Sequence, residues 1–331
     1  MAKWYARLFA LVAFVGLGLS CAVVQADTPR FKIGFSQATT TEPWRLLFNT
    51  ELRTEAAKYP EIELLVRNAQ DSVSKQVSDV HALLDIGIDA LLISPKVAEG
   101  LTEVVNKAYE SGVPVFVLDR DISNDRYTQF IGSDNRAIGE AAGRYVVDLL
   151  GGAGKAKGTV VEIWGGMAST PAQDRHRGFR AVTDGEPGIR FLIPPTDGDW
   201  KMDQGYRIMR EAMAMAEAQG EVIDVVYAHN DPMAYGAYLA AEDTGKGDQI
   251  AFVGIDAIPS EGVRWVAEGI LDATFLYATP GAEAIRQALA HLNGQTVPKR
   301  VTLPTATVTL DTAQEIMTTS GLPPATEASN R

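Results

Sequence analysis

The sequence predicts an α/β protein made of two doubly wound, Rossmann-like lobes, each built on a parallel sheet. From residue 31 onward, short apolar runs alternate with longer amphipathic stretches. Strands that alternate with helices of this length indicate βαβ units and a parallel sheet. The same alternation starts again near residue 159. The chain has 331 residues, of which 46% are hydrophobic, so it can build a sizeable core. That length suits about two domains of roughly 150 residues each.

Each expected strand is a short apolar run, and each expected helix follows it with apolar residues on one face. In the first half the strands are expected at 31–35, 62–67, 90–93 and 113–118, with helices at 44–58, 74–86 and 100–111. In the second half the strands are expected at 159–164, 190–193, 225–228 and 250–255, with helices at 171–182, 201–219 and 232–244.

The last part of the chain departs from this repeat. One more strand is expected at 273–277 and a helix at 281–292, and the stretch 301–310 is extended and rich in Thr and Val. A chain that ends in this way can cross back between two lobes. Residues 319–331 are expected to form a loose tail, since small and polar residues dominate there.

The N-terminus has the features of a secretory signal over residues 1–26. Lys3 and Arg7 precede an apolar run at 8–19, and small residues stand before a cleavage site after Ala26. The apolar run is shorter than the ~20 residues of a membrane span. A soluble, exported protein that starts at Asp27 is therefore expected.

Cys21 is the only cysteine, so the exported chain would have no disulfide and no thiolate metal site. The alternative is a lipoprotein anchored at Cys21, but Gly18 stands where a lipobox has leucine. The net charge of −12 argues against a nucleic-acid partner, because proteins that bind nucleic acids usually carry a basic patch.

Signals of catalysis are weak. The glycine-rich loop at 151–158 lacks the spacing and the strand-to-helix order of a phosphate loop. The four histidines are dispersed without metal-ligand spacing. Asp119 and Asp121 are the one candidate acid/base pair, and adjacent carboxylates at a strand end commonly serve as hydrogen-bonding groups. We therefore expect no enzyme activity, no cofactor and no metal.

Polar and aromatic side chains gather where the expected strands end. In open parallel α/β sheets, ligands bind at the carboxyl ends of the strands. A sugar needs carboxylates and amides for its hydroxyls, arginine forks in fixed geometry and flat aromatic faces for its C–H patches. Taken singly, a strand-end Asp is usually a helix cap and a Trp is usually core. The strand ends hold Asp119, Asp256, Asn230, Arg45, Arg120, Arg175, Trp44, Trp200 and Tyr277.

Eight motifs carry a resemblance to a known family. They are GFSQ with PWR (34–45), LLISP (91–95), VFVLDR (115–120), GSDN (132–135), AQDRHRGF (172–179), GDW (198–200), YAHNDPMAYGA (227–237) and GIDAIP (254–259). Together they make the chain resemble the periplasmic sugar-binding proteins of ABC importers, the ribose-binding type of the type I periplasmic binding proteins. Within that group the chain is most similar to the galactofuranose-binding branch, and the resemblance spans about residues 31–310.

The resemblance implies a ligand set around one monosaccharide. Trp44 and Trp200 would stack on the ring faces, and Arg45 would reach the ring from the first loop. Asp119 and Arg120 would bind hydroxyls from the N-terminal lobe. The remaining hydroxyl contacts would come from the C-terminal lobe, through Arg175, Asn230 and Asp256.

Some positions depart from the ribose binders. Ser94 replaces an asparagine, Tyr277 a glutamine and Glu42 a polar amide, while Arg45 replaces a second aromatic residue. The Trp-Arg pair is shared with the galactofuranose branch and favours a hexose in furanose form. Glu42 and Lys96 leave a polyol or a charged sugar open.

The resemblance also implies the organisation and the partners. The N-terminal lobe would comprise 27–133 and 278–303 and the C-terminal lobe 134–277 and 304–318, with a three-segment hinge near Ser133, Tyr277 and Leu303. The lobes would close on the sugar in the periplasm, and the monomer would deliver it to an inner-membrane ABC permease with its ATPase. A chemoreceptor is a further possible partner. A lactose-repressor type of regulator or a secreted glycosidase is the alternative from another class.

Overall fold

The structure is a computed structural model that describes residues 29–323. The expected signal segment 1–26, Cys21 and the end of the tail at 324–331 lie outside the described residues. Within 29–323 no helix is long and apolar enough to cross a membrane.

The N-terminal lobe is built on a six-stranded parallel sheet with the order β12-β5-β4-β3-β1-β2. Every neighbouring pair in this sheet is parallel. The strands are β1 (Phe31–Gln37), β2 (Ile62–Asn68), β3 (Ala90–Ser94), β4 (Val115–Leu118), β5 (Gln129–Ser133) and β12 (Arg300–Leu303).

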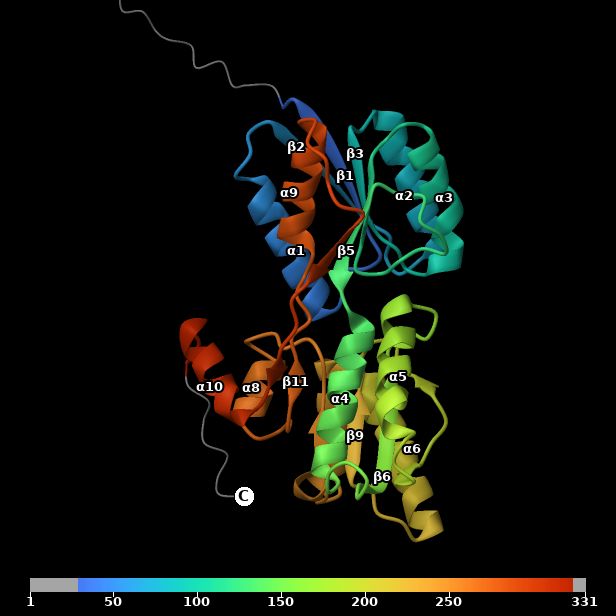
Figure 1. The fold of residues 1–331 in the computed structure, drawn as a ribbon, viewed down its shortest axis with the longest axis vertical. Helices are drawn as coiled ribbons and strands as arrows, with labels where there is room; N and C mark the ends of the chain where they lie inside the picture. The colour runs from blue at the N-terminus through green and yellow to red at the C-terminus, as the bar shows by residue number, and fades with distance from the viewer. Residues whose placement is uncertain (1–28, 324–331) are drawn as a thin grey trace, which may run out of the picture.

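Helices cover both faces of this sheet, as Figure 1 shows. On one face lie α1 (Pro43–Ala56) and α9 (Gly281–Leu292), and on the other lie α2 (Val73–Ile86) and α3 (Ala98–Glu110). Alternate strand residues point to opposite faces. Accordingly Phe35 packs with Phe48 of α1 in one buried cluster, whereas Leu91 packs with Leu83 of α2 in another. The core therefore has two layers, as a doubly wound fold requires.

The C-terminal lobe repeats this plan around a second sheet with the order β10-β9-β6-β7, and β8 pairs with β6 further along. Helices α4 and α5 cover one face of this sheet, and α6 and α7 cover the other. The elements are β6 (Lys157–Trp164), β7 (Gly188–Phe191), β8 (Thr196–Asp197), β9 (Val225–Ala228), β10 (Ala251–Val253), α4 (Asn135–Leu149), α5 (Thr170–Thr183), α6 (Met202–Gln219), α7 (Asp231–Glu242) and the 3-10 turn η1 (Gly247–Gln249).

The end of the chain packs beside this second sheet. An antiparallel pair joins β11 (Thr274–Phe275) to β13 (Thr307–Val308), and α8 (Gly262–Ala267) and α10 (Leu310–Thr319) lie next to it. The capping box at the start of α10, between Thr309 and Thr312, marks a helix that the sequence analysis did not assign.

Three crossings join the lobes, at the end of β5, between β11 and α9, and between β12 and β13. Two doubly wound parallel-sheet lobes with a three-segment hinge are the fold class that the sequence predicts. The expected strands and helices are found with shifts of a few residues at their ends.

No strand or helix was predicted between residues 119 and 158, where β5 and α4 lie. Gly139 and Gly143 lower the helical propensity of the α4 segment. The structure gives their reason. A Cβ at Gly139 would overlap the carbonyl of Arg175, and one at Gly143 would press on Val182, so the two glycines let α4 approach α5 closely.

Candidate functional site

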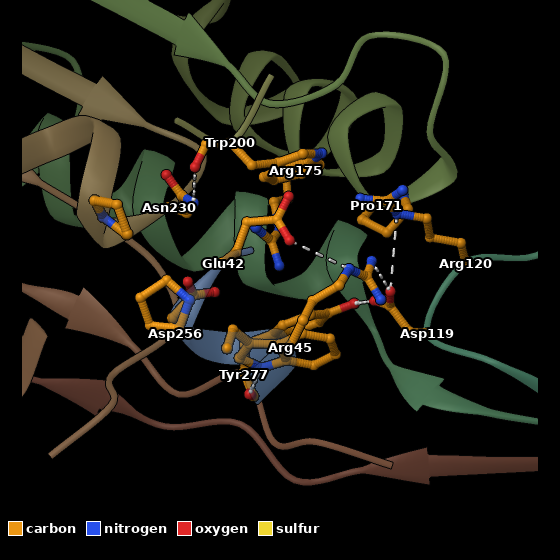
Figure 2. A pocket seen from close by; sticks show the side chains of 13 residues that line it. Glu42, Arg45, Asp119, Arg120, Pro171, Arg175, Trp200, Asn230, Asp256 and Tyr277 are labelled. Carbon is orange, nitrogen blue, oxygen red and sulfur yellow. Dashed lines mark hydrogen bonds and ion pairs between the residues drawn. The ribbon is translucent and has the colours of Figure 1, made fainter. Parts of the chain in front are cut away.

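A cavity lies between the two lobes. Strand-end loops and helix starts from both lobes surround it, and Figure 2 shows their side chains converging. All the predicted site residues except Ser94 line it. The lining residues are Glu42, Pro43, Trp44, Arg45, Asp119, Arg120, Pro171, Arg175, Trp200, Asn230, Pro232, Asp256 and Tyr277.

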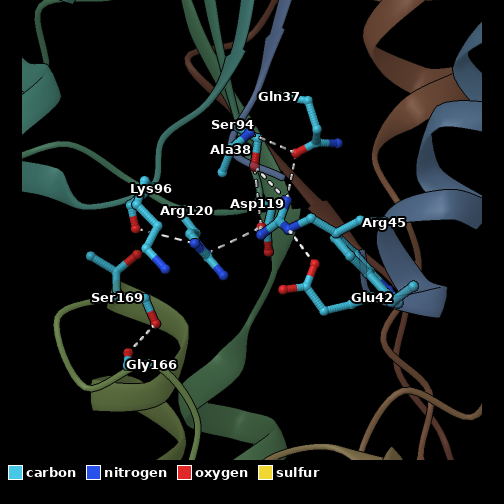
Figure 3. A network of polar contacts seen from close by, with 12 residues as sticks. Gln37, Ala38, Glu42, Arg45, Ser94, Lys96, Asp119, Arg120, Gly166 and Ser169 are labelled. Carbon is cyan, nitrogen blue, oxygen red and sulfur yellow. Dashed lines mark hydrogen bonds and ion pairs between the residues drawn. The ribbon is translucent and has the colours of Figure 1, made fainter. Parts of the chain in front are cut away.

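Arg45 is buried and fixed by side chains of its own lobe (Figure 3). Its guanidinium donates to Oε1 of Gln37 at 2.7 Å, to Oγ of Ser94 at 2.9 Å and to Oδ2 of Asp119 at 2.8 Å. Glu42 lies 3.9 Å from its Nε. Ser94 therefore sits behind Arg45 instead of lining the cavity, and it acts on the site by orienting this arginine.

Asp119 receives hydrogen bonds at both carboxylate oxygens. The hydroxyl of Tyr277 donates to Oδ1 at 2.5 Å, and Arg45 and Ser94 donate to Oδ2. Burial alone would raise the pKa of Asp119, but the guanidiniums of Arg45 and Arg120 and the Tyr277 hydroxyl hold it below its ordinary value. Asp119 is therefore a carboxylate that the protein keeps ionised inside the cavity wall.

Arg120, the neighbour of Asp119, makes fewer hydrogen bonds within the protein than Arg45 does. Its Nη1 donates to the carbonyl of Lys96 at 3.1 Å, and its Nε lies 3.8 Å from Asp119. Burial, followed by repulsion from Arg45, lowers the pKa of Arg120 to about 10, so it stays cationic at neutral pH. Arg120 thus retains N–H groups that a ligand can use.

Two tryptophans line the cavity, one from each lobe. The ring of Trp44 stacks on Tyr277 with centroids 5.0 Å apart and an angle of 28°, and its Nε1 donates to the Tyr277 carbonyl at 2.7 Å. The ring of Trp200 is packed against Gly165 and Gly166, where a Cβ would overlap it. The guanidinium of Arg175 lies over the Trp200 ring at 5.4 Å. Both rings are held rigidly, as stacking platforms need to be.

Arg175 connects the cavity to the hinge. Its side chain is buried, and it donates to Oδ1 of Asn135 at 2.9 Å and to the carbonyl of His229. Asn135 donates in turn to the hydroxyl of Tyr277 at 3.3 Å. Asn135 begins α4, so the same gap that hid α4 also hid this residue, although the GSDN motif contains it.

Asn230 and Asp256 differ in how far the protein satisfies them. Asn230 caps α7, since its Oδ1 accepts from the Met233 N–H at 3.0 Å, and its Nδ2 donates to the Trp200 carbonyl at 3.0 Å. No described residue donates a hydrogen bond to the carboxylate of Asp256, which is 7% exposed. Burial and then the nearby Asp231 raise the pKa of Asp256 well above its ordinary value. The side chain of Asp256 is therefore available for hydrogen bonds with a ligand.

Backbone strain marks the same strand ends. Asp119, Trp200 and Asp256 have φ values of 66°, 65° and 138°, in the region that favours glycine. Such conformations cost about 1–3 kcal/mol each and cluster at functional sites. The strain therefore supports the assignment of this cavity as the functional site.

Contacts across the cleft hold the lobes together in this structure. Nζ of Lys96 lies 3.4 Å from Oδ1 of Asp199 in the other lobe, and the Asp121 N–H donates to the hydroxyl of Thr170 at 2.9 Å. Within its own lobe, Lys96 also pairs with Asp71 at 2.5 Å. The two lobes thus meet around the cavity, which is the closed arrangement of a two-lobed protein.

Three prolines line the cavity without having been predicted as site residues. Pro43, Pro171 and Pro232 stand in the first turns of α1, α5 and α7. Proline suits this position because the first helical N–H groups have no partner in the helix. A Pro just after each expected strand-end loop was the signal that could have found them. Within residues 29–323 no group of three or more His, Cys, Asp or Glu side chains could hold a metal ion.

Comparison with known proteins gives consistent matches. Residues 33–296 match the family model of the periplasmic binding protein domain. The galactofuranose-binding protein YtfQ of Escherichia coli is 31% identical over 314 residues, which cover 92% of this chain and 95% of that protein. The ribose import binding protein RbsB of Bacillus subtilis is 30% identical, covering 83% and 86%. The solved fructose-binding periplasmic domain of a hybrid two-component system is 38% identical with a TM-score of 0.82, covering 88% and 94%.

Proposed function

Because this chain belongs to the periplasmic binding protein family, we propose that it is the solute-binding component of an ABC importer and binds a monosaccharide between its two lobes. The observation that carries the proposal is the cavity itself, in which both lobes present arginines, carboxylates and tryptophans to one space. The relatives are binding proteins, and the chain is not an enzyme. It captures its solute without making or breaking a covalent bond.

The charges in the cavity favour a neutral ligand. Three arginines, Arg45, Arg120 and Arg175, face three carboxyl groups, those of Glu42, Asp119 and Asp256, so the charges balance when Asp256 is ionised. A charged sugar would leave one charge unpaired in a buried site, which is costly. Neutral hydroxyls, which donate and accept, suit both the carboxylate of Asp256 and the free N–H groups of Arg120.

The aromatic walls favour a ring over an open-chain polyol. A sugar ring offers flat C–H patches to Trp44 and Trp200, and the charged side chains between the two tryptophans fix the orientation of the sugar. The ligands named for the three relatives reported above, galactofuranose, ribose and fructose, are sugars that form five-membered rings. We therefore propose that the ligand is a monosaccharide in furanose form. Arg45 and Ser94 form the part of the cavity wall in which this site differs from that of the ribose binders.

Closure of the two lobes links the binding of the sugar to its delivery to the permease. The sugar contacts both lobes only in the closed form, so binding shifts the population towards closure about the three-segment hinge. A micromolar Kd corresponds to about −8 kcal/mol. Hydrogen bonds to Asp256 and the arginines, together with two stacked faces, can supply this after desolvation. The closed form would then dock on the permease and its ATPase in the inner membrane.

The domain boundaries and the processing of the chain belong to the same proposal. We place the N-terminal lobe at 27–133 and 278–303 and the C-terminal lobe at 134–277 and 304–318. The chain would be exported to the periplasm with cleavage after Ala26 and act there as a monomer. Delivery to an importer is preferred over signalling to a chemoreceptor because the ribose-binding relative is named as an import protein.

A thermal-shift screen tests the proposal. The purified protein is heated with D-ribose, D-fructose, D-galactose, L-arabinose, D-glucuronate, xylitol or buffer alone. A ligand that binds only the native state raises the melting temperature with its concentration. We expect a shift with at least one neutral sugar and none with D-glucuronate. Failure of every neutral sugar, or recovery of a chemically altered sugar, would contradict the proposal.

A further inference from the structure

Asp231 joins three segments of the C-terminal lobe. Its carboxylate is buried, Oδ2 accepts from the Ala257 N–H at 2.8 Å, and Oδ1 accepts from the Thr274 hydroxyl at 2.6 Å. The backbone N–H of Asp231 donates to the Ile255 carbonyl at 2.7 Å. One residue thus connects the start of α7, the loop after β10 and the strand β11.

Each of these segments carries a residue that lines the cavity (Figure 2). Asn230 precedes α7, Asp256 lies in the loop after β10, and Tyr277 follows β11. Asp256 and the next residue, Ala257, have φ values of 138° and 53°. Because residues other than glycine rarely adopt such angles, specific contacts must hold this loop. The hydrogen bond from Ala257 to Asp231 is one of them, beside a longer one from Ala257 to Thr274 and the backbone bonds that Asp256 makes with the β11 segment.

The chain around the Asp231 carboxylate is shaped to admit it. A Cβ added at Gly254 or at Gly262 would overlap its carboxylate oxygens. The two glycines flank the Asp256 loop, one before it and one at the start of α8. The loop is therefore closed tightly around this carboxylate, although Asp231 itself does not line the cavity.

The two neighbouring carboxyl groups influence one another. Burial raises the pKa of Asp231 to about 7, against the hydrogen bonds from Thr274 and Ala257, while Glu261 raises it and Arg175 lowers it. Burial also raises the pKa of Asp256, followed by Asp231, with Arg175 lowering it and Glu261 and Asp119 raising it further. Ionising both groups together is unfavourable, because like charges in a buried site repel.

We propose that Asp231 is a positioning residue for ligand binding, which aims the Asp256 carboxylate into the cavity and, through its own charge, opposes the ionisation of Asp256. This inference rests on the proposed function, since it requires a sugar that donates hydroxyl hydrogens to Asp256. An ionised Asp256 is the better acceptor, so affinity rises as pH rises and Asp256 loses its proton. Removing the charge of Asp231 moves that rise to lower pH.

Three variants separate the two effects. Asp231→Asn removes the charge and keeps the geometry, because the amide oxygen can accept from Ala257 while the amide nitrogen donates to the Thr274 oxygen. Asp231→Ala removes both hydrogen bonds. Thr274→Val removes the hydrogen bond that Thr274 donates to Asp231 and the one it accepts from the Ala257 N–H at 3.2 Å, while the Asp231 carboxyl group stays in place. It serves as the second test if Asp231→Ala does not fold.

The experiment is a calorimetric titration between pH 5 and pH 8.5. The probe is whichever of D-ribose, D-fructose, D-galactose and L-arabinose binds the wild type most tightly. At pH 8 we expect Asp231→Asn to bind within about threefold of the wild type, and its rise in affinity to lie at least about one pH unit lower. Asp231→Ala should bind at least ~10-fold more weakly, and Thr274→Val several-fold more weakly.

The outcomes distinguish this inference from the proposed function. An Asp231→Asn profile that coincides with the wild-type profile would overturn the inference, as would wild-type affinity in Asp231→Ala or in Thr274→Val. If the wild type binds none of the four sugars, the proposed function fails and the inference fails with it.

Discussion

The charged residues of the cavity differ in how much of their hydrogen-bonding capacity the protein uses. Arg45 and Asp119 are satisfied by each other and by Gln37, Ser94 and Tyr277. The carboxylate of Asp256 accepts no hydrogen bond from the described residues, and neither does Oε2 of Glu42, which is buried with Nε of Arg45 3.9 Å away. The first pair therefore builds the wall of the site, and the second pair is left for a ligand.

Asp256→Asn should weaken sugar binding and yet stabilise the unliganded protein. The pKa of Asp256 is raised in the folded state, so the folded chain binds more protons than the unfolded chain from about pH 3.9 up to that raised value. The free energy of unfolding therefore falls as pH rises through this window. The asparagine variant escapes this loss, and calorimetry should show that it melts higher than the wild type near pH 8 and about equally near pH 4.

The control for this prediction is Asp85→Asn, which changes an exposed carboxylate on α2. It should alter neither the sugar affinity nor the pH dependence. An Asp256→Asn protein that melts below the wild type at every pH would show that this carboxylate has a structural partner after all.

The buried pair of Arg45 and Asp119 should show strong energetic coupling. Breaking a buried ion pair by removing one partner costs about 3–5 kcal/mol, because the other charge is left buried. Chemical denaturation of Arg45→Gln, of Asp119→Asn and of the double variant should therefore give a double-variant loss well below the sum of the single losses. Additive losses would contradict the network.

The matched control for this cycle is Arg126→Gln. Arg126 pairs with Glu110 at 2.6 Å, but both side chains are more than half exposed, at 60% and 56%. Exposed pairs contribute little, so this change should leave the unfolding transition nearly unmoved.

At the scale of elements, regular periodicity made most of the fold predictable. The alternation of apolar runs and amphipathic stretches located the strands of both sheets, and the strand-end rule located most of the cavity. Prediction from periodicity failed where contacts between elements determine which residue type stands at a position. The helix α4 was missed because its glycines serve the contact with α5, and Asn135 was missed with it.

The position of Ser94 could not be read from the sequence either. It stands at the end of β3, as a ligand-contacting residue does. The guanidinium of Arg45 reaches across the strand ends and covers it, and that contact depends on the packing of α1 against the sheet. Likewise the three prolines became visible as cavity residues only once the helix starts were placed in space.

Gly178→Ala should destabilise the C-terminal lobe and weaken sugar binding. Gly178 lies on α5 where the helix meets α4, and an added Cβ would overlap the carbonyl oxygen of Arg136. Overpacking of this kind typically costs about 1–3 kcal/mol. It would also shift Arg175 relative to Asn135, so the melting temperature and the sugar affinity should both fall.

Gly185→Ala is the control for this helix contact. It lies just beyond the end of α5, and the nearest atom to an added Cβ is 3.5 Å away. Circular dichroism melts should place this variant beside the wild type. Equal melting temperatures for both alanine variants would contradict the close approach of α4 and α5.

At the scale of the whole molecule, sugar binding depends on closure of the two lobes. Three crossings allow the lobes to rotate as bodies, and the contacts between Lys96 and Asp199 and between Asp121 and Thr170 are made across the cleft. Contacts of this kind are present in the closed form and stabilise it relative to the open form. Sugar affinity therefore includes their free energy.

Lys96→Ala should lower the sugar affinity modestly. A partly exposed ion pair contributes about 0.2–1 kcal/mol, which corresponds to a loss of up to about fivefold, and the loss should shrink as salt screens the pair. Titrations at low and high salt measure both. Lys107→Ala is the control, since Lys107 pairs with Glu103 within α3. A loss that is the same for both variants would rule out a closing role for Lys96.

The most direct test of sugar binding between the lobes is a calorimetric titration of the wild type and of Asp256→Ala with the neutral sugar that gives the largest thermal shift. We expect one sugar per chain with a Kd near the micromolar range for the wild type, and binding weakened by at least about 100-fold in a folded Asp256→Ala protein. Equal affinity in the two proteins, or no heat of binding with any neutral monosaccharide, would contradict it.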